Sequence, residues 1–131
     1  MIAANAEKAI AFHLSPGNYH DAPEGNKLLS TLDKPTESCS VIMDRAYEGD
    51  ETRKLVSELG YTPVVPPKKN RLVPWEYDKQ LYKKRNEVER LFCRLKGFRR
   101  IATRYDKLDI MFMGFIVLAL IFIELKNWRT L

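Results

Sequence analysis

Residues 82–96 hold a tyrosine, two cations and a carboxylate at spacings that suit one face of a helix. At about 100° per helical residue, four side chains fall within an arc of roughly 60°: Tyr82, Arg85, Glu89 and Lys96. An apolar stripe runs beside them, formed by Leu81, Val88, Phe92 and Leu95. Glu89 is therefore predicted at the edge of a buried face, where a carboxylate among cations suits a divalent metal or a metal-bound phosphate. The alternative is an ordinary amphipathic helix with charge pairs such as Arg85–Glu89.

A second carboxylate, Asp44, follows the short apolar run at residues 40–43. Such a run is typical of a buried strand. Ligands of open α/β sheets bind beyond the carboxyl ends of strands, so Asp44 lies at a position that suits a ligand. The alternative is that Asp44 only caps the turn that follows the strand.

The elements that must position these two acids alternate along the chain. Apolar runs and turn residues predict strands at 8–14, 40–43 and 61–65. Capping and stop residues predict helices at 21–32 and 51–59, with Asp21 and Asp50 as caps and Gly60 as a stop. A long helix is predicted from Tyr77 or Asp78 to Lys96, after a basic loop at 68–75. This alternation predicts an α/β layer whose sheet is at least partly parallel.

Charge is unevenly distributed over the 131 residues, whose formal net charge is +5. Residues 1–67 carry six Lys/Arg against ten Asp/Glu, whereas residues 68–107 carry fourteen against five. The basic block predicts a phosphate-rich partner, with a merely solvated surface as the alternative. Cys39 and Cys93 have no metal-like spacing, which fits free thiols in a reducing compartment.

The apolar segment Ile110–Ile123 could be mistaken for a membrane span. It is shorter than the ~18 residues of a convincing span, and we expect a buried core helix. A membrane-associated protein, with this segment beside a basic flank, remains the third functional alternative. Residues 1–8 have no basic start and are not expected to be a signal peptide.

The spacing Tyr82-x2-Arg85-x3-Glu89-x6-Lys96 resembles the signature of bacterial DDE-type insertion-sequence transposases. Four longer segments resemble the same family: His13–Ala22, Val41–Asp50, Pro63–Arg71 and Tyr77–Lys107. The resemblance extends from about Ala11 to Leu125 and implies an α/β, RNase H-like mixed sheet flanked by helices. It implies one partial catalytic domain over residues 1–131, with strand–helix alternation at 8–67, a basic loop and catalytic helix at 68–107, and an apolar core helix at 108–125.

The resemblance also implies a reaction. In the family, two Asp and one Glu hold two Mg²⁺ or Mn²⁺ ions, which activate water or a DNA 3′-hydroxyl for in-line attack on a phosphodiester. Asp44 matches the second Asp and Glu89 matches the Glu. Tyr82, Arg85 and Lys96 match the signature residues and are expected to contact DNA. The basic block adds further candidate phosphate contacts: Lys68, Lys69, Arg71, Arg99 and Arg100.

The family's first Asp has no match in this sequence. We expect it on a strand upstream of residue 8, so that the protein acts when joined to an upstream segment or to the product of an upstream reading frame. A catalytically inactive, DNA-binding remnant is the alternative. The expected partners are the element ends, the target DNA and further copies of the full-length form, without a membrane. The expected location is the bacterial cytoplasm, at the nucleoid.

Overall fold

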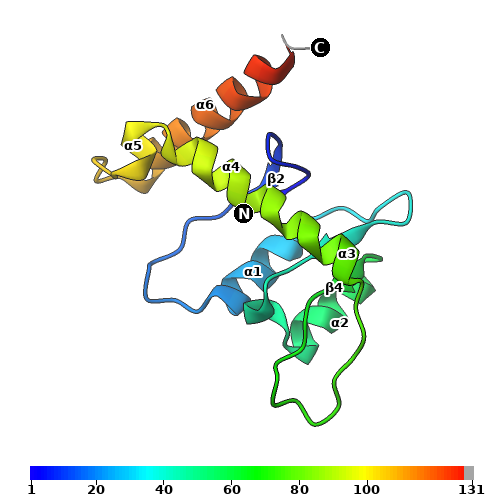
Figure 1. Cartoon of the computed structure of the whole chain (residues 1–131). Helices are drawn as coiled ribbons and strands as arrows, with labels where there is room; N and C mark the ends of the chain where they lie inside the picture. The colour runs from blue at the N-terminus through cyan, green and yellow to red at the C-terminus, as the bar shows by residue number, and fades with distance from the viewer. Residues whose placement is uncertain (129–131) are drawn as a thin grey trace. The chain divides into compact units, whose positions relative to one another are not determined.

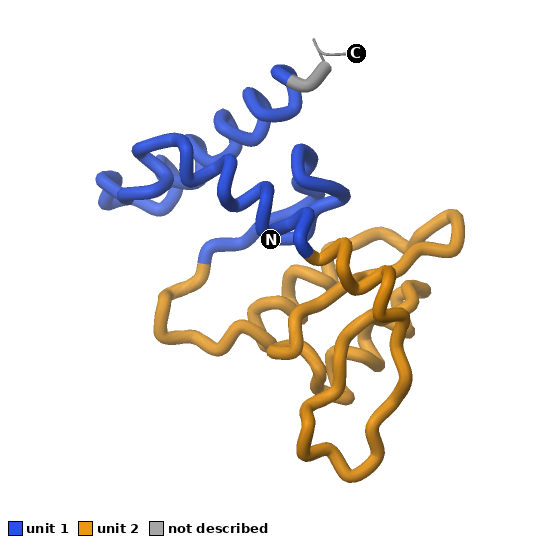
Figure 2. The backbone as a smooth tube through the Cα atoms, viewed as in Figure 1, with its two compact units in different colours: residues 1–14, 86–131 blue, residues 15–85 orange. Residues whose placement is uncertain are grey.

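The computed structural model describes residues 1–128, with side chains to residue 126, and contains two compact units (Figure 2). Unit 1 combines residues 1–14 with the chain from Asn86 onward. Unit 2 is the continuous segment Ser15–Arg85. Helices and short strands occur in both units, which confirms a mixed α/β chain. The described strands form two separate two-stranded sheets.

Unit 2 is built around a parallel strand pair. Strand β3 (Ser40–Ile42) pairs with β4 (Thr62–Val64), with Val41 opposite Pro63. Helix α2 (Asp50–Glu58) connects them, and α1 (Asp21–Leu29) packs beside α2 (Figure 1). A strand–helix–strand connection of this kind places both strands in one direction. The predicted parallel pairing is therefore confirmed.

The core of unit 2 lies between these helices and the strand pair. Val56 of α2 and Val65 after β4 are fully buried, and Met43 after β3 is 6% exposed. Helix α2 ends before Gly60, whose φ of +89° favours glycine. The stop predicted at this glycine is confirmed, and Tyr61 N donates to Val56 O at 3.1 Å as the chain turns into β4.

The helix starts in unit 2 differ from the prediction. Asp21 and Asp50 are the first residues of α1 and α2, and the cap positions belong to His20 and Gly49, which make no side-chain capping bond. The predicted capping by these two aspartates is therefore wrong. Both carboxylates lie in a first helical turn, where a negative charge still interacts favourably with the helix dipole. Helix α1 also ends at Leu29, three residues earlier than predicted.

Unit 1 begins with a hairpin of β1 (Ile2–Ala3) and β2 (Ala9–Ala11). The strand predicted at 8–14 is thus shorter than expected, and β1 was not predicted. Asn5 holds the turn because its Oδ1 accepts from the backbone N–H groups of Glu7 and Lys8, both at 2.9 Å. This local side-chain bonding is a known property of asparagine in turns.

The predicted long helix is interrupted. Helix α3 (Lys79–Tyr82) begins as expected at Asp78, whose Oδ1 accepts from the N–H groups of the second and third helical residues. A 3₁₀ turn, η2 (Lys83–Arg85), then precedes α4 (Asn86–Lys96). A 3₁₀ helix has 3.0 residues per turn, so the angular arithmetic that placed Tyr82 and Glu89 on one stripe fails across this turn.

The buried face of helix α4 overlaps the predicted one only in part, since Leu95 belongs to the predicted stripe and Leu91 does not. The buried residues of the helix are Leu91 and Leu95, whereas Phe92 is 41% exposed. Glu89 is exposed, so its predicted place at the edge of the buried face is wrong. At 100° per residue, Glu89 lies about 160° from Leu91 around the helix, which accounts for its exposure.

Helix α6 (Asp109–Trp128) packs against α4 with only part of its surface. Ile116, Ala119 and Ile123 are buried, and the last two join the core formed by Leu91 and Leu95. The predicted helix is present, but the prediction of a buried core helix is correct for one face only, because most of the apolar side chains on its other faces are exposed. Among the described residues, no helix has the length and apolarity needed to cross a membrane. The short α5 (Arg99–Ala102) follows α4 after a single turn at Gly97 and Phe98.

Candidate functional site

Asp44 lies two residues beyond β3, at the start of the 3₁₀ turn η1 (Arg45–Tyr47). Its Oδ1 accepts from the N–H of Arg45 at 2.6 Å, so Asp44 does cap the turn as the structural alternative predicted. The side chain is nevertheless 58% exposed, and its Oδ2 lies 3.7 Å from Nη1 of Arg85. Capping therefore leaves the carboxylate accessible, next to a cation.

Arg85 brings a second signature residue to this carboxylate. Its guanidinium lies 5.8 Å from the ring centroid of Tyr82, within the range of a cation–π contact. Tyr82 in turn makes an edge-to-face contact with Tyr77, with ring centroids 5.6 Å apart. Unit 2 thus gathers three predicted site residues, Asp44, Tyr82 and Arg85. A guanidinium beside an exposed carboxylate can bind a phosphate while the carboxylate binds a cation.

Tyr47 belongs to the same neighbourhood and was missed by the sequence analysis. It closes the turn after Asp44, and its N–H donates to Asp44 O at 2.9 Å. Burial raises the pKa of its phenol, and the negative charges of Asp21 and Asp44 raise it further. A Cβ at Gly25 would collide with the Tyr47 ring, so this glycine permits the approach of α1 to the turn. No spacing rule points to such a contact.

The other signature residues, Glu89 and Lys96, lie on α4 in unit 1, and both are exposed. The neighbouring Glu87 is partly buried instead, and its Oε2 accepts from the N–H of Ala6 at 3.1 Å. Glu87 thereby ties α4 to the hairpin. The two predicted metal ligands, Asp44 and Glu89, thus belong to different units.

Asp44 and Glu89 suit a hard divalent cation by their chemistry, because Mg²⁺ prefers carboxylate oxygens together with water. Both side chains are exposed enough to leave room for such waters. Within residues 1–128, no group of three or more His, Cys, Asp or Glu side chains is arranged to hold a metal. The case for a divalent cation therefore depends on the chemistry of Asp44 and of Glu89, each considered by itself.

The basic loop before α3 is held by ion pairs to a buried carboxylate. Glu48 is 6% exposed, and its Oε1 and Oε2 lie 3.1 Å from Lys68 Nζ and 3.0 Å from Arg71 Nη1. Arg71 also binds Asp50. Burial opposes ionisation of Glu48, but hydrogen bonds and charge from Lys68 and Arg71 lower its pKa below the usual value. Two cations predicted to contact phosphate are thus already paired within the protein.

Trp75 completes this arrangement, and the sequence analysis did not single it out. Its ring lies 3.6 Å from the guanidinium carbon of Arg53 and 4.6 Å from that of Arg71. Its Nε1 donates to Val65 O at 2.8 Å. A tryptophan among arginines in a basic segment is a signal that could have been noticed, since guanidinium groups stack well on indole.

The junction between α4 and α5 presents its cations differently. Lys96 and Arg99 are exposed and make no ion pair with the described residues. Arg100 lies over the ring of Phe115, at 4.3 Å, and its Nη2 is 3.9 Å from Asp106. This junction therefore offers more accessible positive charge than the basic loop does.

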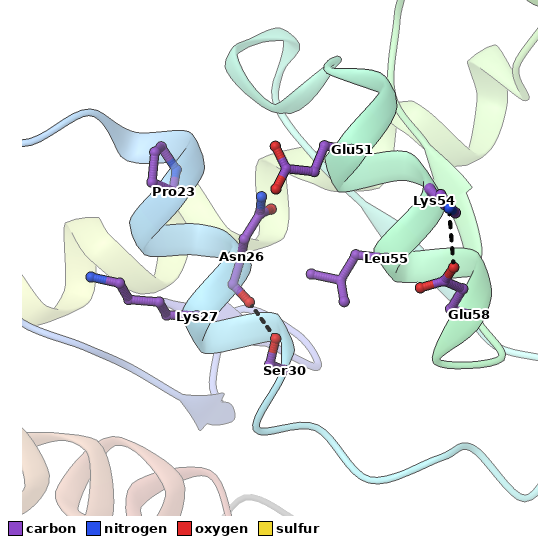
Figure 3. Close-up of a pocket in the computed structure, with 8 residues that line it drawn as sticks. All are labelled: Pro23, Asn26, Lys27, Ser30, Glu51, Lys54, Leu55 and Glu58. Carbon is purple, nitrogen blue, oxygen red and sulfur yellow. Dashed lines mark hydrogen bonds and ion pairs between the residues drawn. The ribbon is translucent and has the colours of Figure 1, made fainter.

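A surface hollow of about 460 Å³ lies between α1 and α2 (Figure 3). Asn26 and Leu55 line it, together with the ion pair of Lys54 and Glu58 at 3.7 Å. No predicted site residue contributes to it. Its mixed, exposed charges give it no evident link to the Asp44 cluster.

Comparison with known proteins identifies the family. A family model described as "Transposase DDE domain" matches residues 1–123. A curated protein of Brucella ovis, named "Putative transposase for insertion sequence element IS6501", is 38% identical over 113 residues, which is 86% of this chain and 85% of the relative. No solved structure matches the chain. The chain therefore belongs to the DDE transposases of insertion sequences.

Proposed function

We propose that this protein takes part in metal-dependent cleavage and transfer of DNA strands during transposition of an insertion sequence. The observation that carries the proposal is the gathering of Arg85 and Tyr82 beside the strand-end carboxylate of Asp44. A phosphodiester needs a cationic contact and a site for a divalent ion to react by this chemistry. The match to a transposase DDE domain supports polynucleotidyl transfer as the reaction.

In this proposal, Asp44 and Glu89 are the residues that hold Mg²⁺ or Mn²⁺. When bound, the ions stabilise the charge that develops on the attacking and leaving oxygens. Arg85 binds the phosphate beside Asp44, and Tyr82 holds its guanidinium in place from the other side. Lys96 contacts the DNA backbone along α4.

The finer architecture is also part of the proposal. The family match runs through both compact units, which supports one RNase H-like catalytic domain over residues 1–131, despite the division at Arg85. A first Asp, contributed by a segment joined upstream, would complete the acid set. The working form would be an oligomer that binds two element ends at the nucleoid.

The experiment measures Mg²⁺-dependent cleavage of DNA that carries the element's ends. The chain is assayed alone and joined to the segment encoded immediately upstream. Asp44→Asn and Glu89→Gln are each expected to lower the cleavage rate by about a thousandfold, because a carboxylate ligand of the reacting ions is lost. Asp33→Asn and Glu51→Gln are matched controls on exposed positions of unit 2. Cleavage that persists in both site variants contradicts the proposal.

The assay also tests whether an upstream segment is needed. If the isolated chain cleaves as fast as the joined form, and if Glu89→Gln abolishes this cleavage, the upstream Asp is not required. If only the joined form cleaves, the expectation of a completed acid set is correct. Asp44→Asn should fold normally, because asparagine can also accept the hydrogen bond from the Arg45 N–H.

A DNA-binding protein without catalytic activity is the second candidate. The exposed cations of the α4–α5 junction favour it, since they can bind phosphates without any metal. This function predicts duplex binding that EDTA and Glu89→Gln leave unchanged, together with no cleavage in either the isolated or the joined form. Gel-shift and cleavage assays on the same preparations separate the two candidates.

A further inference from the structure

Residues 66–75 form a loop between β4 and α3 that combines a firmly held base with an apolar tip. In Figure 1 this part of the chain runs out beyond α2 and returns to α3, all within unit 2. The loop contains three cations and no acid. A loop with these properties differs from an ordinary solvated connection, which is usually polar at its tip.

The base of the loop is fixed at both ends. At one end, Lys68 and Arg71 bind the buried Glu48, and Arg71 N donates to Lys68 O at 3.2 Å to close a turn. At the other end, Trp75 donates to Val65 O at 2.8 Å and stacks with Arg71. These contacts bring the two ends of the loop together through Arg71, and they restrict the residues in between.

The tip between these anchors is Leu72 and Val73. Their side chains are 99% and 80% exposed, the two highest values among the large apolar residues of unit 2. Single exposed apolar residues are common and need no explanation. Two adjacent ones, with an anchored residue on each side and Pro74 after them, form an exposed apolar group whose neighbours are already held, which lowers the cost of ordering them on a partner.

The charge around the tip favours a polyanionic partner. Three cations, Lys68, Arg71 and Arg53, bind the two carboxylates of Glu48 and Asp50, and the loop carries Lys69 in addition. Lys69 is exposed and makes no ion pair with the described residues. An apolar protein surface would gain little from this charge, whereas DNA offers phosphates beside the apolar faces of its bases.

We propose that Leu72 and Val73 insert as a wedge into a DNA duplex at a step where the bases unstack, while Lys69 contacts the adjacent phosphates. Apolar side chains used in this way partly unstack a base step and kink the duplex. The inference rests on the proposed DNA-related function and adds a specificity to it. The loop would select DNA that is easily distorted, through the lower cost of unstacking there.

The test compares binding of the full chain to two duplexes of one sequence, a perfectly paired duplex and one with a single mismatch. The wild-type chain should bind the mismatched duplex about tenfold more tightly, because part of the unstacking cost has been removed. Leu72→Ser with Val73→Ser should abolish this preference and leave affinity for the paired duplex nearly unchanged. Tyr19→Ser, an exposed side chain on another loop of unit 2, is the matched control and should keep the preference.

Insertion itself is measured with 2-aminopurine placed beside the mismatch. Its fluorescence should rise on binding of the wild-type chain and of Tyr19→Ser, but not on binding of the double variant. Equal wild-type affinity for both duplexes overturns the wedge while DNA binding stands. The wedge is also overturned if the double variant loses the same affinity for both duplexes. Leu72 and Val73 would then contribute to binding equally whether or not the bases are easily unstacked. Absence of any duplex binding overturns the proposed function and the wedge together.

Discussion

Two cationic regions of this chain have similar composition and different surroundings. The basic loop at residues 66–75 contains Lys68, Lys69 and Arg71, and the α4–α5 junction contains Lys96, Arg99 and Arg100. In the loop, two of the three cations bind Glu48. At the junction, only Arg100 has an acidic partner among the described residues, at the long distance of 3.9 Å.

The difference shows that the position of carboxylates, rather than the number of cations, determines what a basic segment does. Glu48 is buried and lies close to two cations, so breaking these pairs would leave a carboxylate with little solvent. Lys96 and Arg99 have no such constraint and can exchange water and counterions for phosphate. Lys68 and Arg71 therefore hold structure, whereas Lys96 and Arg99 are available to DNA.

The largest expected effect comes from removing the accessible cations of the α4–α5 junction. Replacing Lys96 and Arg99 together by alanine should lower affinity for duplex DNA about fiftyfold near 0.1 M salt, because two phosphate contacts are lost. The slope of log affinity against log salt should shrink by about 2. Fluorescence anisotropy over a series of salt concentrations measures both quantities. Lys54→Ala with Lys34→Ala, two exposed lysines of unit 2, is a charge-matched control that should have little effect. An unchanged salt slope in the junction variant contradicts the assignment.

The next largest effect comes from removing the Trp75 anchor of the loop, which lowers the stability of unit 2. Trp75→Ala should lower the free energy of unfolding of unit 2 by about 2 kcal/mol, because it removes two arginine stacks and one hydrogen bond. Trp75→Phe retains an aromatic face and should lose about half as much. Urea unfolding followed by circular dichroism provides the measurement. Phe92→Ala, an exposed aromatic on α4, serves as the control. A loss in Trp75→Ala no larger than in Phe92→Ala would show that the loop is not anchored there.

The same contrast explains which parts of the fold could be predicted. Local signals predicted the stop at Gly60 and the helix start at Asp78, because each depends on a few neighbouring residues. The alternation of strands and helices predicted a partly parallel sheet, which the β3–β4 pair confirms. The break at Lys83–Arg85 was missed, since its residues all favour helix and carry no Gly or Pro. The buried face of α4 was predicted only in part, since Leu95 is buried as expected but Leu91 is buried in place of Phe92.

Site predictions divide in a similar way. The chain positions of Asp44 and Arg85 were predicted, but their separation of 3.7 Å depends on how the chain between them folds. The pairs of Glu48 with Lys68 and Arg71 join residues 20 or more positions apart, and no periodicity indicates such contacts. Sequence reasoning therefore treated every cation of the basic block alike, and only the fold separates anchoring cations from accessible ones.

Lys69 sharpens the comparison from within the loop, because it alone of the three loop cations lacks an acidic partner among the described residues. Lys69→Ala should lower duplex affinity about eightfold near 0.1 M salt and reduce the salt slope by about 1. Lys68→Ala should change the slope less, since the charge of Lys68 is compensated by Glu48. Anisotropy titrations of the two variants at matched salt test this order. A larger effect in Lys68→Ala would reverse the roles of the two lysines.

The smallest effect concerns pH and again separates the two regions. Lys68 and Arg71 hold the pKa of Glu48 below its usual 4.5, and the hydrogen bond from Arg71 lowers the pKa of Asp50 below its usual 3.8. Their stabilising effect is complete above these usual values and is lost as pH falls through the lowered ones, because the unfolded chain then binds more protons. In a Trp128→Phe chain, whose only tryptophan is Trp75, emission should shift to longer wavelength as the loop opens below about pH 4. Glu48→Gln should show much of this shift already at neutral pH, whereas Lys96→Ala should titrate like the parent. A Trp75 signal that follows global unfolding at every pH would show that the loop opens only together with unit 2.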